Sequence, residues 1–277
     1  MSLDALPPLR ASLEAHGLWA RKSFGQHFLL DLNVTRKIAR LAGPLEGRAV
    51  IEVGPGPGGL TRALLEGGAA RVIAVEKDAR FLPLLAELAD AAEGRLTLVE
   101  GDATRVDYAA LLASHAPGAP ARVVANLPYN VGTPLLIGWL RDIGRYESLQ
   151  LMFQLEVAER IAAAPGGDAY GRLAVLAQAV ADAELALRLP ARAFTPPPKV
   201  DSAVTALRPR ADRPDAATLA RLERVTAAAF GQRRKMLRSS LKALGGEALC
   251  TAAQVDLKAR AETVDVAGFL RLAAALE

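Results

Sequence analysis

One stretch constrains this chain more than any other: residues 50–61, with the sequence VIEVGPGPGGLT. An apolar run ends in an acid, and four glycines follow before a helical pattern begins at Leu60. The run predicts a strand buried on both faces of a parallel sheet. The glycines permit a tight turn and the close approach of a ligand, and the free N–H groups of the next helix point back toward it. This pattern is typical of a nucleotide-type site, although a tight turn without a ligand would use the same residues.

Bulk composition excludes several classes of protein. With 277 residues and 51% hydrophobic residues, the chain can bury a full core. We expect no membrane span, because no uncharged apolar run reaches about 18 residues. A single cysteine excludes an internal disulfide and a cysteine-based metal cage, so no metal is expected. Since no apolar core of signal-peptide length stands near the start, cytoplasmic residence is predicted.

Positive charge is concentrated toward the C-terminal end. Residues 1–200 hold 21 Lys+Arg and 21 Asp+Glu, whereas residues 201–277 hold 13 and 9, which accounts for the whole net charge of +4. The surplus favours a polyanionic partner for this part of the chain. A solvated helix face rich in arginine remains the alternative.

Further strands are predicted over residues 71–76, 96–100 and 121–125, and a polar residue stands at or within two positions of the end of each. Glu76 ends the first of them, roughly 20 residues past the glycines, where a carboxylate meets a ribose diol in nucleotide-binding units. Asp102 follows the next strand and could accept a hydrogen bond from an adenine amine or could cap a helix. Asn126 ends the third. Because the carboxyl ends of parallel strands share one crevice, these side chains should lie together with the glycine turn.

The rest of the pattern predicts a larger α/β domain over 1–210 and a small all-α domain over 211–277. In the first we expect a strand over 149–154, helices over 156–163 and 172–181, and strands over 185–189 and 203–207. In the second we expect helices over 217–230 and 233–244. Basic residues would stand at the start of the latter helix, where they oppose the macrodipole, and this favours contacts with phosphate.

Residues 126–130, with the sequence NLPYN, have a specific chemical use. The amine of adenine is a poor nucleophile because its lone pair is delocalised into the ring. The Asn126 side-chain oxygen and the Leu127 carbonyl could accept both N–H groups and stabilise the charge that develops during attack. Pro128 stiffens the turn, and Tyr129 offers a face for base stacking. The pattern predicts alkylation of an extruded adenine without an acid, a metal or a covalent nucleophile.

Two other segments could contribute to the same site. The loop over 21–31 mixes basic, aromatic and amide residues and could close over a ligand, although His27 could equally be a surface or packed histidine. The prolines over 196–198 make a stiff segment that presents Phe194. Phe194 could form the second wall for the base, or it could simply fill the core.

Taken together, these motifs resemble the class I S-adenosylmethionine-dependent methyltransferases, and more narrowly the ribosomal RNA adenine N6,N6-dimethyltransferases. The resemblance rests on the sequences FGQHFL at 24–29, EVGPGPG at 52–58, GDA at 101–103, NLPYN at 126–130 and FTPPPKVDS at 194–202, together with Glu76. It covers nearly the whole chain. It implies a Rossmann-like catalytic domain and dimethylation of two adjacent adenines in a hairpin loop near the 3′ end of 16S rRNA. It also implies a role in biogenesis of the 30S subunit, with 16S rRNA or the pre-30S particle as partner. We further expect a monomer with no membrane partner.

The resemblance assigns roles to individual residues. Cofactor-binding positions would be His27, Leu29, Gly54, Gly56, Glu76, Asp102 and Asn126. Catalytic positions would be Asn126, Leu127, Pro128, Tyr129 and Phe194. Candidate RNA contacts are Arg21, Lys22, Arg233, Arg234, Lys235 and Arg238. Position 27 is often Asn in the family, and its replacement by His weakens that one assignment.

Two alternatives stay open. A relative of the macrolide-resistance type would methylate adenine in 23S rRNA, but the basic helical tail and the proline-rich segment look more like the 16S enzyme. A factor that binds pre-30S particles, with catalysis secondary, belongs to a different functional class. DNA adenine methyltransferases usually carry Asp-Pro-Pro-Tyr, and a dehydrogenase would need an acid or base that NLPY lacks.

Overall fold

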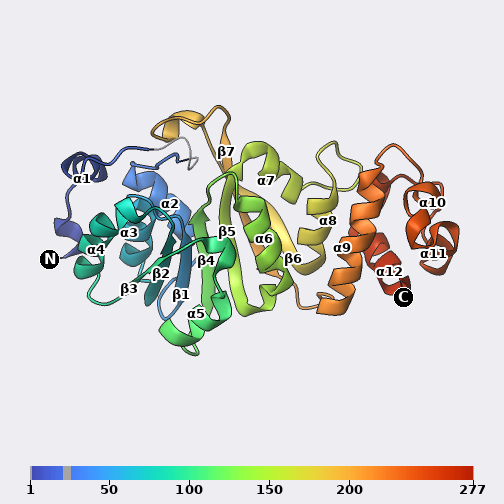
Figure 1. Ribbon diagram of the computed structural model, residues 1–277, viewed down its shortest axis with the longest axis horizontal. Helices are drawn as coiled ribbons and strands as arrows, with labels where there is room; N and C mark the ends of the chain where they lie inside the picture. Colours follow the sequence, from blue (N-terminus) through green and yellow to red (C-terminus); the bar gives the residue numbers. More distant parts are fainter. Residues whose placement is uncertain (1, 21–25, 277) are drawn as a thin grey trace. The chain divides into compact units, whose positions relative to one another are not determined.

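The computed structural model describes residues 2–20 and 26–276 and contains a seven-stranded sheet (Figure 1). Its strands follow the order β3-β2-β1-β4-β5-β7-β6. Their bounds are β1 Ala49–Val53, β2 Arg71–Glu76, β3 Leu96–Glu100, β4 Ala121–Asn126, β5 Tyr146–Gln154, β6 Ala181–Leu189 and β7 Ser202–Pro209. The strand order reverses between β1 and β4, which is where open α/β sheets form a ligand crevice.

Helices alternate with the first five strands. The α-helices are α1 Leu9–Ala15, α2 Leu32–Leu41, α3 Gly59–Glu66, α4 Leu82–Ala91, α5 Tyr108–His115, α6 Gly132–Arg141, α7 Leu155–Ile161, α8 Arg172–Val180, α9 Ala216–Gly231, α10 Leu237–Ser240, α11 Gly246–Ala252 and α12 Val266–Ala275. A short 3-10 helix, η1, spans Leu3–Ala5.

The strands around the crevice are parallel and buried on both faces. β1 pairs in parallel with β2 and β4, and every residue of β1 is buried. β2 also pairs with β3, and β4 with β5, again in parallel. This explains the uninterrupted apolar runs in the sequence, because a strand covered by helices on both sides has no solvent face.

Helices α2 and α3 pack on each other beside these strands. Asp31 caps α2 by accepting from the N–H of Asn33, which fixes the point where the loop becomes a helix. Buried Ile38 from α2 and Leu64 from α3 join Val50, Val72 and Val124 of the sheet in one apolar cluster.

Contacts divide the chain into two compact units. The first comprises Met1–Leu136, Gly144–Leu155 and Leu185–Ala206, and the second comprises Ile137–Ile143, Glu156–Glu184 and Leu207–Glu277. In the second unit α8, α9 and α12 contact one another, and Phe230 stacks on Phe269 while Tyr170 meets Phe230 edge to face. Residues 156–184 therefore belong to the same compact unit as residues 207–277. The domain division at residue 210 stays a prediction.

One expected helix is wrong and another was missed. The helix predicted over 233–244 begins only at Leu237 and ends at Ser240, because α9 runs to Gly231 and a turn follows. Arg233 to Lys235 thus lie just past the C-terminal end of α9, where the macrodipole favours cations, so the expected electrostatic mismatch is absent. Helix α6 had no sequence prediction. Among the described residues, no helix has the length and apolar character needed to cross a membrane.

Candidate active site

A cavity of about 220 Å³ opens where β1, β2, β3 and β4 end. Its lining includes the glycine turn after β1, Glu76 at the end of β2, Asp102 after β3 and the residues around Asn126 after β4. Residues Gln26 to Leu29 form another part of the wall. The sheet thus brings together the four strand ends that the sequence had predicted to share one crevice.

The glycine turn has a shape that other residues would resist. Gly54, Gly56 and Gly58 adopt φ values of +67°, +53° and +83°. A Cβ added to Gly56 would lie 3.2 Å from the Phe28 ring, and one added to Gly54 would lie 3.4 Å from Pro128. The backbone conformation therefore favours glycine at all three positions, and at Gly56 the space for a Cβ is tight as well.

Glu76 holds this turn in place. Its carboxylate accepts hydrogen bonds from the Gly56 N–H at 3.0 Å and from the Asp78 N–H at 2.8 Å. Burial raises the pKa of Glu76, while these two backbone donors act in the opposite direction. The acid at the end of β2 is thus a structural partner of the glycine turn as well as a wall of the cavity.

Glu52, at the penultimate position of β1, is a buried acid with only 2% of its surface exposed. In the described residues its Oε2 atom has no hydrogen-bond partner. Burial, with a smaller effect from the neighbouring Glu76 carboxylate, raises the pKa of Glu52 to about 8 against the lowering effect of Thr61. A neutral, proton-bearing carboxyl group at pH 7 follows.

Asp102 has the cap geometry that was one of its two sequence interpretations, and its contact with an adenine amine stays a prediction. Its Oδ1 accepts from the backbone N–H and the hydroxyl of Thr104, which is cap geometry, while Oδ2 pairs with the Lys77 ammonium at 2.8 Å. The Lys77 ammonium and the Thr104 donors hold the pKa of Asp102 well below its usual range. The carboxylate also lines the cavity and keeps acceptor capacity there.

The NLPY segment follows β4 at the same cavity. The Asn126 amide nitrogen donates to the His27 carbonyl at 3.2 Å, which leaves the side-chain oxygen as an acceptor. The Tyr129 hydroxyl lies 2.7 Å from Ser202 Oγ, and the Tyr129 ring stacks on His27 with centroids 5.6 Å apart. Burial raises the pKa of Tyr129, so its hydroxyl stays neutral at pH 7.

Comparisons with known proteins identify this arrangement. A family model described as ribosomal RNA adenine dimethylase matches residues 17–277. The chain is 71% identical over 273 residues to the ribosomal RNA small subunit methyltransferase A of Phenylobacterium zucineum (strain HLK1), covering 99% of this chain and 94% of that protein. This chain belongs to the ribosomal RNA adenine dimethylase family.

Solved structures share the dimethylase fold. The 23S rRNA methyltransferase ErmE is 28% identical with a TM-score of 0.68, and the match covers 90% of this chain and 99% of that one. A dimethyladenosine transferase from Plasmodium falciparum has a TM-score of 0.71 at 23% identity, covering 89% of this chain and 96% of that one.

The dimethylase family uses S-adenosylmethionine, and the cavity fits this donor on its own geometry. Gly54 and Gly56 line the cavity without side chains, so a ligand can approach their backbone closely. Glu76 and Asp102 supply carboxylate oxygens at adjacent strand ends, which suit the hydroxyl and amine donors of a nucleoside.

Other predicted site residues of the dimethylase fall in different surroundings. Phe194 is 3% exposed and packs in the apolar core with Leu29 and Leu60, as the core alternative had it. Its role as the second wall for a base remains a prediction. The Nδ1–H group of His27 donates to the Pro196 carbonyl at 2.8 Å, which ties the loop to the proline-rich segment. Arg21 and Lys22 lie outside the described residues.

The basic residues of the tail divide into two kinds. Arg233 donates to Glu262 at 2.9 Å and to the Asp168 carbonyl at 3.0 Å, so its charge is engaged within the second unit. Within the part of the chain that the structure describes, Arg234, Lys235 and Arg238 are exposed and have no side-chain hydrogen bond or ion pair. The RNA-contacting roles of all four stay predictions.

Sequence reasoning missed several partners in this dimethylase site. Ser202, which fixes Tyr129, lies in the proline-rich segment that the resemblance had marked, and that was the available signal. Lys77 and Asp78 directly follow Glu76, but no local pattern reveals that they bind Asp102 and Gln26. These contacts join residues 25 and 52 positions apart in the chain.

Proposed function

We propose that this chain transfers methyl groups from S-adenosylmethionine to N6 of two adjacent adenines, in the hairpin loop near the 3′ end of 16S rRNA. The observation that carries this proposal is the placement of residues 126–129 in the same cavity wall as the glycine turn, Glu76 and Asp102. An adenine acceptor site and a nucleoside cofactor site are thereby adjacent. Identity of 71% to a ribosomal RNA small subunit methyltransferase A supports the choice of RNA.

The residues of the chain act by position and electrostatics. When bound, the cofactor supplies a methyl group already activated on a sulfonium. In the first transfer the Asn126 oxygen and the Leu127 carbonyl would accept the two N–H groups of the adenine amine and draw its nitrogen toward a tetrahedral shape. In the second transfer the monomethylated amine would offer them one N–H. In each transfer the nitrogen would gain a methyl group and lose one proton to solvent, and the demethylated cofactor would leave. These acceptors stabilise the positive charge that grows on that nitrogen, so they favour the transition state over the ground state.

Tyr129 would hold the base by stacking, beside His27, which stays the candidate cofactor contact. Their rings already stack on each other, and Ser202 and the Pro196 carbonyl fix their polar ends. A flipped adenine stacked on Tyr129 would gain about 1–3 kcal/mol, which offsets part of the cost of leaving its own stack. The exposed cations of the second unit would bind phosphates, and the chain would work as a cytoplasmic monomer on the pre-30S particle.

Methyl transfer from labelled S-adenosylmethionine tests the proposal. The substrates are 30S subunits that lack the modification and, in parallel, 23S rRNA, with the labelled nucleoside identified by mass. We expect dimethyladenosine in 16S rRNA alone. Label in 23S rRNA would instead indicate a 23S rRNA methyltransferase, the activity that gives ErmE its name. The structural similarity to ErmE, with a TM-score of 0.68, is the reason to test this alternative.

A further inference from the structure

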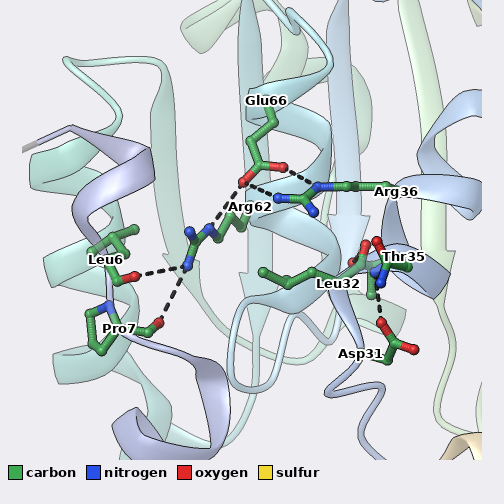
Figure 2. Close-up of polar contacts among 9 residues, drawn as sticks. Leu6, Pro7, Asp31, Leu32, Thr35, Arg36, Arg62 and Glu66 are labelled. Carbon is green, nitrogen blue, oxygen red and sulfur yellow. Dashed lines mark hydrogen bonds and ion pairs between the residues drawn. The ribbon is translucent and has the colours of Figure 1, made fainter.

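Arg62 is a buried cation that binds the N-terminal arm, defined here as residues 2–20. The residue is 7% exposed and lies on α3, the helix that follows the glycine turn. Figure 2 shows its guanidinium between two groups of acceptors. On one side Nη1 donates to the carbonyls of Leu6 and Pro7, at 3.4 and 3.3 Å. On the other side Nε donates to Glu66 at 3.1 Å.

Glu66 makes this position of Arg62 stable. Its carboxylate also accepts two hydrogen bonds from Arg36 of α2, at 2.7 and 3.3 Å (Figure 2). A buried charge is tolerated only when it is paired and hydrogen-bonded, and both conditions hold here. The arm is therefore fastened by charge-assisted hydrogen bonds to its backbone, whatever side chains stand at residues 6 and 7.

Farther along the chain, the arm packs against the N-terminal end of α3, next to the glycine turn. A Cβ added to Gly59, the first residue of α3, would lie 2.8 Å from Leu9 of the arm and 2.9 Å from the Leu29 carbonyl. Leu13 and Leu18 share an apolar cluster with Phe28, Phe81 and Leu85. His16 adds an ion pair of 3.1 Å to Glu87 of α4.

Phe28 and Leu29 connect the arm to the cavity. Both line the cavity, and the Phe28 ring lies against Gly56 of the glycine turn. The Phe28 backbone exchanges hydrogen bonds with Thr195, of 3.0 and 2.9 Å, on its other side. Release of the arm would therefore uncover one face of Phe28 while its backbone stays held, and the cavity wall would lose its packing support.

We propose that Arg62 is a positioning residue for cofactor binding, because it fastens the N-terminal arm that supports Phe28 and Leu29 against the glycine turn. The proposal rests on the proposed use of S-adenosylmethionine in this cavity. The family model begins at residue 17, so most of the arm, including both carbonyls that Arg62 binds, precedes the matched segment. Docking of the arm and occupancy of the cavity are then coupled, and each favours the other.

Two variants and a matched control test this coupling in the full-length chain. Arg62→Ala removes the fastening, and Leu9→Asp opposes docking of the arm from the other side. Arg95→Ala is the control, because Arg95 also donates to two carbonyls of the α3 region, those of Leu65 and Ala69, at 2.9 and 3.4 Å. That site is at the opposite end of α3 from the glycine turn.

The first measurement is the Kd of S-adenosylhomocysteine by titration calorimetry. We expect Arg62→Ala and Leu9→Asp each to weaken binding about tenfold, a usual size for coupled sites. The double variant should lose little more than either single variant, because both act through the arm. Arg95→Ala should lower Tm yet keep Kd within about twofold. In turnover, Arg62→Ala should raise KM for the cofactor and leave kcat at saturation within about twofold.

The second measurement follows the arm itself. The chain has two tryptophans, of which Trp19 in the arm is 67% exposed and Trp139 is 2% exposed. In a Trp139→Phe background the fluorescence anisotropy of Trp19 should fall with Arg62→Ala and recover when the cofactor analogue is added.

Equal loss of affinity in Arg62→Ala and Arg95→Ala would overturn the inference, as would unchanged affinity in Arg62→Ala. Failure of the wild-type chain to bind the analogue would overturn the proposed function and this inference with it.

Discussion

Among single residues, Glu52 has an environment that makes folding depend on pH. The carboxyl group is 2% exposed, and burial followed by the nearby Glu76 carboxylate raises its pKa to about 8 from an ordinary value of 4.5. The unfolded chain loses this proton near pH 4.5, while the folded chain keeps it to about pH 8. Unfolding therefore releases a proton between these values, and the free energy of unfolding falls as pH rises through that window.

Glu52→Gln should remove this dependence, because the amide is neutral at every pH. Without cofactor, we expect the free energy of unfolding of the wild-type chain to fall, relative to that of the variant, by up to about 1.4 kcal/mol per pH unit between pH 5 and pH 8. Urea unfolding at pH 5.5, 6.5 and 7.5 measures it. Glu223→Gln is the control, since Arg141 holds the pKa of Glu223 low and that group stays ionised throughout the window. Parallel pH profiles for wild type and Glu52→Gln would contradict the prediction.

A substitution at Asn126 tests whether its side chain acts in catalysis, in binding of the particle, or in both. Asn126→Ala removes the side-chain acceptor for the adenine amine, and we expect kcat to fall by about 10²–10³, the usual cost of losing one preorganised group. Binding of the 30S particle should survive, because phosphate contacts elsewhere carry most of the affinity. Labelled methyl transfer and particle sedimentation separate the two effects. Loss of both at once would show that binding depends on the catalytic pocket.

Between elements, the connection from β1 to α3 is the most constrained part of the fold. Glu76 at the end of β2 holds the Gly56 N–H, and Phe28 of the loop packs on the same glycine. Three segments from different parts of the chain thus meet at one residue, and its backbone has a φ of +53°.

Gly56→Ala should destabilise the chain by about 1–2 kcal/mol from backbone strain alone, and it should also displace Phe28 and weaken cofactor binding. Gly118→Ala is a matched control, because Gly118 has a φ of +72° with nothing within 4 Å of the added Cβ. Chemical unfolding and calorimetric titration would be run on both. Equal effects on cofactor affinity would remove the argument for a close approach at Gly56.

The sequence predicted elements well where burial alone determines them. β1, β2, β3 and β4 lie within a residue of their expected bounds, because an apolar run between glycines leaves few alternatives. It failed over 233–244, where charged residues follow Gly231 and the local pattern cannot tell a turn from a new helix. In the site, it placed Glu76, Asp102 and Asn126 at one cavity but missed the contacts of Glu76 with Gly56 and of Tyr129 with Ser202. Those contacts depend on tertiary structure.

For the whole molecule, RNA affinity should depend on which cations are already paired. All three arginines are exposed, but Arg233 is bound by Glu262 and by the Asp168 carbonyl, whereas Arg234 and Arg238 have no side-chain partner within the described residues. Counterion release makes each phosphate contact visible as a change in the salt dependence of binding.

Arg234→Ala and Arg238→Ala should each weaken binding to the 30S particle and lower the slope of log K against log salt by about 1. Arg233→Ala should instead lower Tm, because it leaves the half-buried Glu262 carboxylate and the Asp168 carbonyl without their partner, and should change the slope less. Filter binding at several salt concentrations measures the affinity and the slope, and thermal unfolding measures Tm. If the slope changed more for Arg233→Ala than for Arg234→Ala, Arg233 and not Arg234 would be the phosphate contact.

The fastening of the arm has a consequence for the order in which the chain can fold during its synthesis. Leu6 leaves the ribosome before its partner Arg62, which follows 56 residues later. At about 5–20 residues per second, the arm emerges several seconds before α3 exists to receive it. Until then the leucine side chains of the arm lack the partners on which they pack in the folded chain. Docking of the arm therefore has to follow formation of α3, although residues 2–20 are made before that helix, and Phe28 and Leu29 gain the support of the arm only then.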